Sequence, residues 1–171
     1  RQEWRYEWVE LLNTGKQQAN LAGWQLEGYR QEQDFAIALQ GVVGPGEYFV
    51  LGASGAIPEV DLSYNNLAGK FVNSGQRLVL KNALGEVAEE VDASGGWFAG
   101  SNEAKRSMER RFAERGAADP ANWGTSRKEG GTPGAENSVQ GQEAAVALEE
   151  ALGEEGVGQT KQGAFSSLWY G

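Results

Sequence analysis

Short apolar runs, separated by turns rich in Gly, Asn and Pro, fill the chain from residue 1 to about residue 137. In the run at 7–13 (EWVELLN), alternate side chains of a strand point to opposite faces, so Val9 and Leu11 share one face and Trp8 lies on the other. A segment that is apolar on one face and mixed on the other belongs in a sheet packed against a second sheet. The regular spacing of such runs predicts an all-β sandwich or barrel.

Further runs have the length and alternation of strands. They cover residues 21–26, 35–39, 48–51 and 77–80, and a return strand with Val87 and Val91 follows a hairpin turn at 82–85. Residues 53–69 contain several turn-forming residues and are predicted to form a surface loop. The charged stretch at 101–116 fits a strand and a helix equally well.

The sequence changes character after residue 137. Residues 142–152 are rich in Ala, Glu and Leu with one apolar face, a pattern typical of an amphipathic helix. A glycine ends this helix at Gly153 and a Gly-rich linker follows, before the aromatic end segment FSSLWY at 165–170. We therefore expect a β-sandwich over 1–137 and a C-terminal extension over 138–171.

Composition excludes several kinds of chemistry. The chain has no Cys and no His, which removes disulfides, thiolate metal sites, the usual general base and the commonest zinc ligand. Acidic residues outnumber basic ones by 24 to 15, giving a net charge of −9, so nucleic acid is a poor default partner. No apolar run is long enough to span a bilayer. We expect a non-catalytic protein without a membrane span.

The start of the chain bears on its location. It begins at Arg1 rather than Met, and no signal peptide is visible. We interpret this as a processed or excised chain, compatible with a secretion signal that has already been removed.

Adjacent carboxylates at 89–90, 149–150 and 154–155 are the first candidate chemistry. General acid–base catalysis needs two carboxyl groups in different environments. Adjacent residues of a strand point apart, and the two later pairs fall on the predicted helix and linker. We therefore interpret all three pairs as solvated surface groups.

Calcium is the metal that acidic oxygen ligands could hold. The candidate ligands are Asp61, Asn65, Asn66 and Asp92, but no Asp-x-Asp-x-Asp spacing accompanies them. Loop and turn roles are the favoured interpretation, with no cofactor expected and calcium kept as the alternative.

The stretch at 101–116 contains four arginines: Arg106, Arg110, Arg111 and Arg115. Their guanidinium groups could bind a phosphate or a carboxylate ligand. Such a run more often pairs with acidic neighbours, here Glu103, Glu109 and Glu114. Glu7 is a further candidate, as an internal brace to Arg110 or Arg77.

The order of the motifs resembles the lamin tail domain family, including its bacterial members. The matching pieces are EWVELLN at 7–13, LAGW at 21–24, PGEY at 45–48, FVNSGQRLVL at 71–80, NALG at 82–85, SMER at 107–110, Trp123 and TPGAEN at 132–137. The resemblance implies an immunoglobulin-like β-sandwich with no catalytic residues to transfer. For bacterial members it also implies a secreted or surface location, often beside nucleases or other hydrolases, and for nuclear lamins protein and DNA partners.

The resemblance also bears on the tryptophans. Trp24 and Trp123 match family positions that belong to the core, whereas Trp8 and Trp97 remain candidates for stacking on a carbohydrate. We expect the first pair to be buried.

The tail lies outside the resemblance, and its apolar residues are too few to order it in isolation. An extended end segment can add as a strand to the sheet edge of another copy, and a head-to-tail contact of this kind builds a filament. We therefore expect Phe165, Leu168, Trp169 and Tyr170 to bind a protein partner, another copy of the chain, outside the cell or on its surface. The alternatives are a tail that packs on its own sandwich, and an accessory domain cut from a secreted hydrolase.

Overall fold

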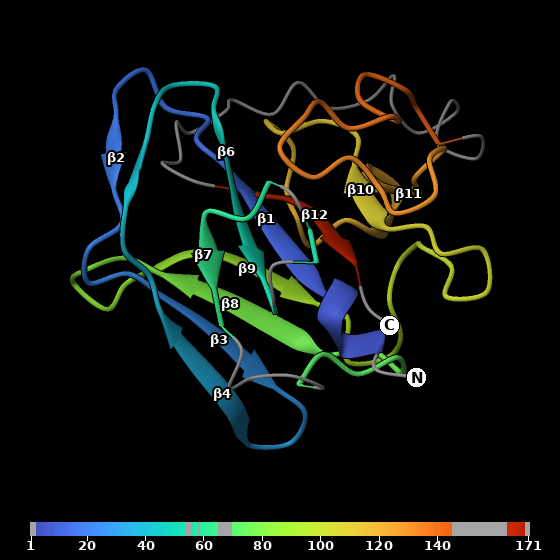
Figure 1. Ribbon diagram of the computed structural model, residues 1–171, viewed down its shortest axis with the longest axis horizontal. Helices are drawn as coiled ribbons and strands as arrows, with labels where there is room; N and C mark the ends of the chain where they lie inside the picture. The colour runs from blue at the N-terminus through green and yellow to red at the C-terminus, as the bar shows by residue number, and fades with distance from the viewer. Residues whose placement is uncertain (1–2, 54–55, 58, 65–69, 145–163, 170–171) are drawn as a thin grey trace.

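The computed structural model describes residues 3–53, 56–57, 59–64, 70–144 and 164–169 (Figure 1). The strands are β1 (Trp8–Leu12), β2 (Ala19–Asn20), β3 (Gln25–Tyr29), β4 (Gln33–Ala38), β5 (Val42–Val43), β6 (Tyr48–Gly52), β7 (Leu62–Ser63), β8 (Arg77–Lys81), β9 (Val87–Asp92), β10 (Met108–Arg110), β11 (Trp123–Thr125) and β12 (Ala164–Trp169). Two short 3-10 turns, η1 (Glu3–Tyr6) and η3 (Pro120–Asn122), precede β1 and β11. Within the described residues, no helix has the length and apolar character needed to cross a membrane.

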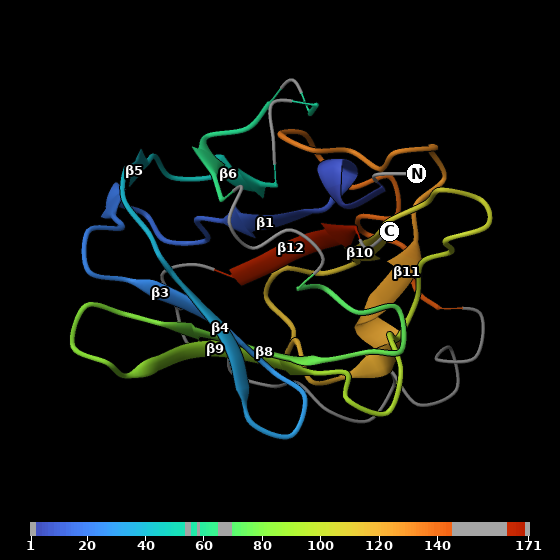
Figure 2. The same cartoon turned by 60° about the horizontal axis from the view of Figure 1, so that its bottom comes forward.

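Two sheets pack face to face and make the predicted immunoglobulin-like β-sandwich. The larger sheet has the strand order β11-β10-β12-β1-β6-β7, and the smaller has the order β4-β3-β8-β9. Figure 2 shows β1 and β12 in one layer with β3, β8 and β9 in the other. Most neighbouring strands are antiparallel, whereas β6 and β7 run parallel. The all-β prediction is confirmed.

The core lies between the two sheets, as the alternation along β1 predicts. Val9 and Leu11 are buried there together with Leu26 of the opposite sheet. Trp8 lies on the other face of β1, in a small cluster with Val50. Both faces of β1 are therefore covered, one by the opposite sheet and the other by this small cluster.

The tryptophans divide largely as expected. Trp24 and Trp123 are buried in the main core, which confirms the prediction. Trp8 is only 2% exposed, so the suggestion that it stacks on a carbohydrate is wrong. The indole N–H of Trp97 donates to the carbonyl oxygen of Val72 at 2.8 Å, which ties that ring to its own domain.

The structure decides between helix and strand in the arginine-rich stretch. Residues 108–110 form β10, and an isolated bridge between Ser101 and Arg106 precedes it, so the helix alternative is wrong. The helix predicted over 142–152 falls outside the described residues from residue 145 onward and stays a prediction.

Two glycines with positive φ give a matched test of the turns. Gly75 has φ +101°, and a Cβ there would lie 2.1 Å from the carbonyl oxygen of Ala93. Gly85 has φ +79° in the β8–β9 turn, with nothing within 4 Å of an added Cβ. At both positions an L side chain would be strained by the positive φ, but only at position 75 would the added Cβ also clash with backbone atoms. We expect Gly75→Ala to lower the free energy of unfolding by about 1–3 kcal/mol more than Gly85→Ala in urea denaturation. Equal losses would contradict this packing.

Candidate functional site: the C-terminal strand and the residues that hold it

Strand β12 lies in the interior of the larger sheet, between β1 and β10. Its backbone pairs with β1 from Trp8↔Trp169 to Leu12↔Ala164. On the other side it pairs with β10 through Met108↔Leu168 and a neighbouring pair. Strand β12 therefore joins the β10–β11 hairpin to the rest of the sheet.

This position changes the expectation for the tail. The tail was expected to add to a sheet edge of another copy, and the structure instead places residues 164–169 inside their own sandwich. This was the alternative that the sequence left open. We expected the sandwich to end at residue 137 and residues 138–171 to form an extension outside it. Residues 164–169 of that extension instead belong to the sandwich.

The four residues expected to bind a partner have different outcomes. Phe165 is 3% exposed and belongs to the main core, so it is not available on the surface. Leu168 and Trp169 form part of β12, in register with Val9 and Trp8 of β1. Tyr170 lies outside the described residues.

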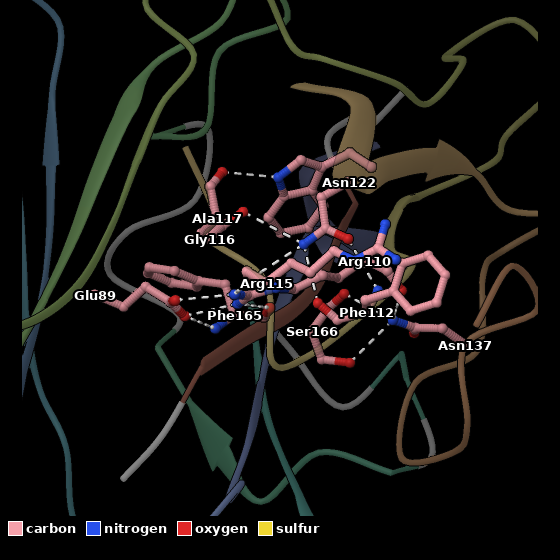
Figure 3. Close-up of polar contacts among 11 residues, drawn as sticks. Glu89, Arg110, Phe112, Arg115, Gly116, Ala117, Asn122, Asn137, Phe165 and Ser166 are labelled. Atoms are coloured by element: carbon pink, nitrogen blue, oxygen red, sulfur yellow. Dashed lines mark hydrogen bonds and ion pairs between the residues drawn. The ribbon is translucent and has the colours of Figure 1, made fainter. Parts of the chain in front are cut away.

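Two charged side chains hold the backbone of Phe165 (Figure 3). Its N–H donates to Oε2 of Glu89 at 2.7 Å, and its carbonyl oxygen accepts from Nη1 of Arg110 at 3.0 Å. Glu89 comes from β9 in the opposite sheet and Arg110 from β10. The contact therefore links both sheets to β12.

Arg110 and Glu89 also form a buried ion pair. The two N–O distances are 2.8 Å and 3.1 Å, in the parallel arrangement typical of arginine with a carboxylate. Their side chains are only 3% and 2% exposed. Arg110 also donates to the carbonyl oxygen of Arg115 and lies 5.9 Å from the ring of Trp123. Its charge is thus paired within the sandwich.

The interpretation of Glu89 as a solvated surface group is wrong. Its neighbour Glu90 does lie at the surface and pairs with Arg77 at 2.7 Å. The signal was present in the sequence, because Glu89 is two residues from Val91 and so shares its inward face. A buried partner for Arg110 could have been found from that alternation.

Asn137 completes the set of side chains that hold β12. Its side-chain amide donates to the carbonyl oxygen of Ser166 at 2.8 Å and to its Oγ at 3.1 Å (Figure 3). Ser166 is the extra residue of a bulge, because Leu11 pairs with Phe165 whereas the preceding residue of β1 pairs with Ser167. Asn137 therefore bonds the backbone carbonyl at the point where the ladder to β1 is interrupted.

Glu109 fixes the segment that carries Asn137. Its carboxylate is fully buried and accepts from Oγ1 of Thr132 at 2.8 Å and from N and Oγ of Ser138 at 2.8 and 2.7 Å. The TPGAEN segment at 132–137 is thereby held against β10. We call Glu89, Arg110 and Asn137, with the facing edges of β1 and β10, the β12-binding site.

Arg111 and Arg115 have structural roles, but with different partners from those expected. Arg111 donates to the carbonyl oxygens of Trp123 and Gln142 at 3.1 and 3.0 Å. Arg115 pairs with Glu143 at 2.7 Å, and this hydrogen bond lowers the pKa of the Glu143 carboxyl. The paired arginines reach residues distant in sequence, so the assignment to nearby acidic residues is wrong for Arg110 and Arg115.

Arg110 and Arg77, the two arginines for which Glu7 was the candidate brace, form ion pairs with other glutamates. Arg110 pairs with Glu89, and Arg77 pairs with Glu90. Glu7 itself is 2% exposed, just before β1.

The candidate calcium ligands serve local structure where they are described. Asp61 accepts from the N–H of Val50 at 2.8 Å, and Asp92 accepts from N and Oγ of Ser94. Asn65 and Asn66 lie outside the described residues. In the part of the chain that the structure describes, no group of three acidic side chains could hold a metal ion.

The two packed sheets define an immunoglobulin-like domain. The family model of the Lamin Tail Domain matches residues 1–95, more than half of the chain. The chain belongs to the lamin tail domain family, whose domains are immunoglobulin-like and non-enzymatic. A search of curated proteins gives no significant match. The family match ends before β10, so Arg110, Asn137 and β12 lie beyond it.

Proposed function

We propose that this protein is a non-catalytic, extracellular structural module that assembles with other copies by exchanging β12. The observation that carries the proposal is the position of β12, an inner strand supplied by the end of the chain. The resemblance to bacterial members of the family, which are usually secreted or surface-exposed, supports the extracellular setting. The resulting polymer would be a surface filament.

An exchanged β12 would make the same contacts that it makes within one chain. Without it, β1 and β10 present two unpaired edges that face each other, and such edges accept an added strand. Because the contacts are the same in both arrangements, protein concentration and the connecting segment decide which arrangement prevails.

The connecting segment is long enough for exchange. Residues 145–163 precede β12, and a fully extended chain covers about 3.3–3.6 Å per residue, so their maximum span is on the order of 60 Å. A domain of this size has a radius of gyration of about 15 Å. A strand on this connection can therefore reach the β12-binding site of a neighbour.

The geometry of exchange determines the product. If each copy gives its strand to the next, the contact is head to tail and produces a filament, whereas mutual exchange between two copies closes a dimer. The proposal predicts the open form. The alternative from the sequence, an accessory domain beside a secreted hydrolase, predicts that β12 stays in its own sandwich at every concentration.

A pair of complementary variants tests the exchange. Arg110→Ala damages the site but leaves the strand intact, and Phe165→Asp damages the strand but leaves the site intact. We expect the wild-type chain, refolded at increasing concentration, to give species larger than a monomer in analytical ultracentrifugation. The two variants refolded together should give a 1:1 complex that neither gives alone. The reason is that the intact strand of the Arg110→Ala chain can enter only the intact site of the Phe165→Asp chain. A wild-type chain that stays monomeric throughout, with no complex in the mixture, would refute the proposal.

A further inference from the structure

We infer that Glu89, Arg110 and Asn137 recognise the backbone of an incoming strand that a second copy of this chain supplies. The strand that they accept is uncharged and extended, with an aromatic residue followed by serine. This inference rests on the proposed exchange and specifies what the exchanged segment must be. Three buried polar side chains, from β9, β10 and the 132–137 segment, converge on two successive residues of one strand (Figure 3).

These side chains replace part of a strand. Backbone pairing between β12 and β10 covers Leu168 and Ser167 only. At the next two residues the partners are side chains: Asn137 for Ser166, and Arg110 with Glu89 for Phe165. Side chains have a fixed place and length, so they fix the register of the strand, whereas a regular ladder alone would allow it to slip.

The site restricts which residue can stand at positions 165 and 166. The residue at 165 must have a backbone N–H to donate to Glu89, which excludes proline. Its side chain is buried in the main core, which requires a large apolar group. The residue at 166 is buried as well, and its hydroxyl contacts the amide of Asn137, which favours a small polar side chain.

The buried part of the site also excludes charged side chains. The charges of Glu89 and Arg110 are already paired with each other, so a charged side chain at position 165 or 166 would be buried without a partner. Residues 162–171 contain no charged side chain, although the chain as a whole has 39 acidic and basic residues (24 and 15). The end of the chain thus has the chemistry that the site accepts, and a second copy supplies the same end.

The test uses the full-length chain and a labelled synthetic peptide. The chain is unfolded in urea and refolded by dilution with an excess of fluorescent peptide of residues 160–171, and the peptide retained after gel filtration is measured. We expect retention of the native peptide. Peptides with Phe165→Asp or Phe165→Pro should be retained at least tenfold less, because they place a charge in the core or remove the N–H that Glu89 accepts.

A double-mutant cycle tests the contact at Ser166. We expect a Ser166→Ala peptide to be retained a few-fold less by the wild-type chain, and the same peptide to lose nothing further on an Asn137→Ala chain. Glu90→Gln, which alters a surface pair beside Glu89, is the matched control and should leave retention unchanged. If the Asn137→Ala chain fails to refold, the peptide variants with the wild-type chain still decide the result.

The outcomes separate this inference from the proposed function. Capture of the native peptide with the expected sequence dependence, by a chain that remains monomeric at all concentrations, would support the β12-binding site as a peptide reader and refute the filament. Assembly of the wild-type chain with equal capture of native and Phe165→Asp peptides would support exchange and overturn the selection described here. No capture of the native peptide would also overturn it.

Discussion

Arg110→Ala is expected to lower the free energy of unfolding by about 3–5 kcal/mol, because it leaves Glu89 as a buried carboxylate without its cation. The substitution also removes the hydrogen bonds to the carbonyl oxygens of Phe165 and Arg115. The six tryptophans provide the signal for urea denaturation followed by fluorescence.

The matched control is Arg77→Ala. Arg77 pairs with Glu90, the residue next to Glu89, and the two side chains are 40% and 37% exposed. Exposed pairs of this kind contribute about 0–1 kcal/mol. The two substitutions thus compare a buried and an exposed arginine–glutamate pair whose glutamates are neighbours on β9. Similar losses for both would contradict the burial of the Arg110–Glu89 pair.

Phe165→Ala is expected to cost about 3–5 kcal/mol, the usual range for truncating a fully buried aromatic side chain. The side chain is part of the main core and anchors β12 beside β1, in register with Leu11. Differential scanning calorimetry of the full-length chain should therefore show a clearly lower melting temperature.

Leu84→Ala is the control for this substitution. Leu84 is 82% exposed in the β8–β9 turn, and surface substitutions usually change stability by less than about 0.5 kcal/mol. A Phe165→Ala variant as stable as Leu84→Ala would mean that β12 does not occupy the core of its own chain.

Local pattern predicted the parts of this fold that local chemistry determines. The alternation of Val9 and Leu11 identified the two faces of β1, and Asn82 with Gly85 marked the β8–β9 turn, where the N–H of Gly85 donates to the carbonyl oxygen of Asn82. In each case the residues that carry the signal lie within a few positions of one another, so a single sequence contains it.

The β12-binding site depends on contacts between distant parts of the chain, so only fragments of it could be predicted from the sequence. The TPGAEN motif contained Asn137, but its bond to Ser166 exists only once β12 lies beside β10. Glu89 was assigned to the surface because charged residues usually are exposed, and tertiary pairing with Arg110 overrides that tendency. No glycine or other local sequence signal predicts the bulge at Ser166.

The antiparallel pairing of β1 with β12 also has a kinetic consequence. It joins strands from the two ends of the chain, so nearly the whole polypeptide forms the loop that this pairing closes. The β3–β4 and β8–β9 hairpins, by contrast, join segments close in sequence. Because long-range pairing incurs its entropy cost before its contacts form, the hairpins are expected to form early and β12 to dock last. During synthesis β12 also emerges after the other strands of this sandwich, so β1 and β10 are both made before the strand that pairs between them.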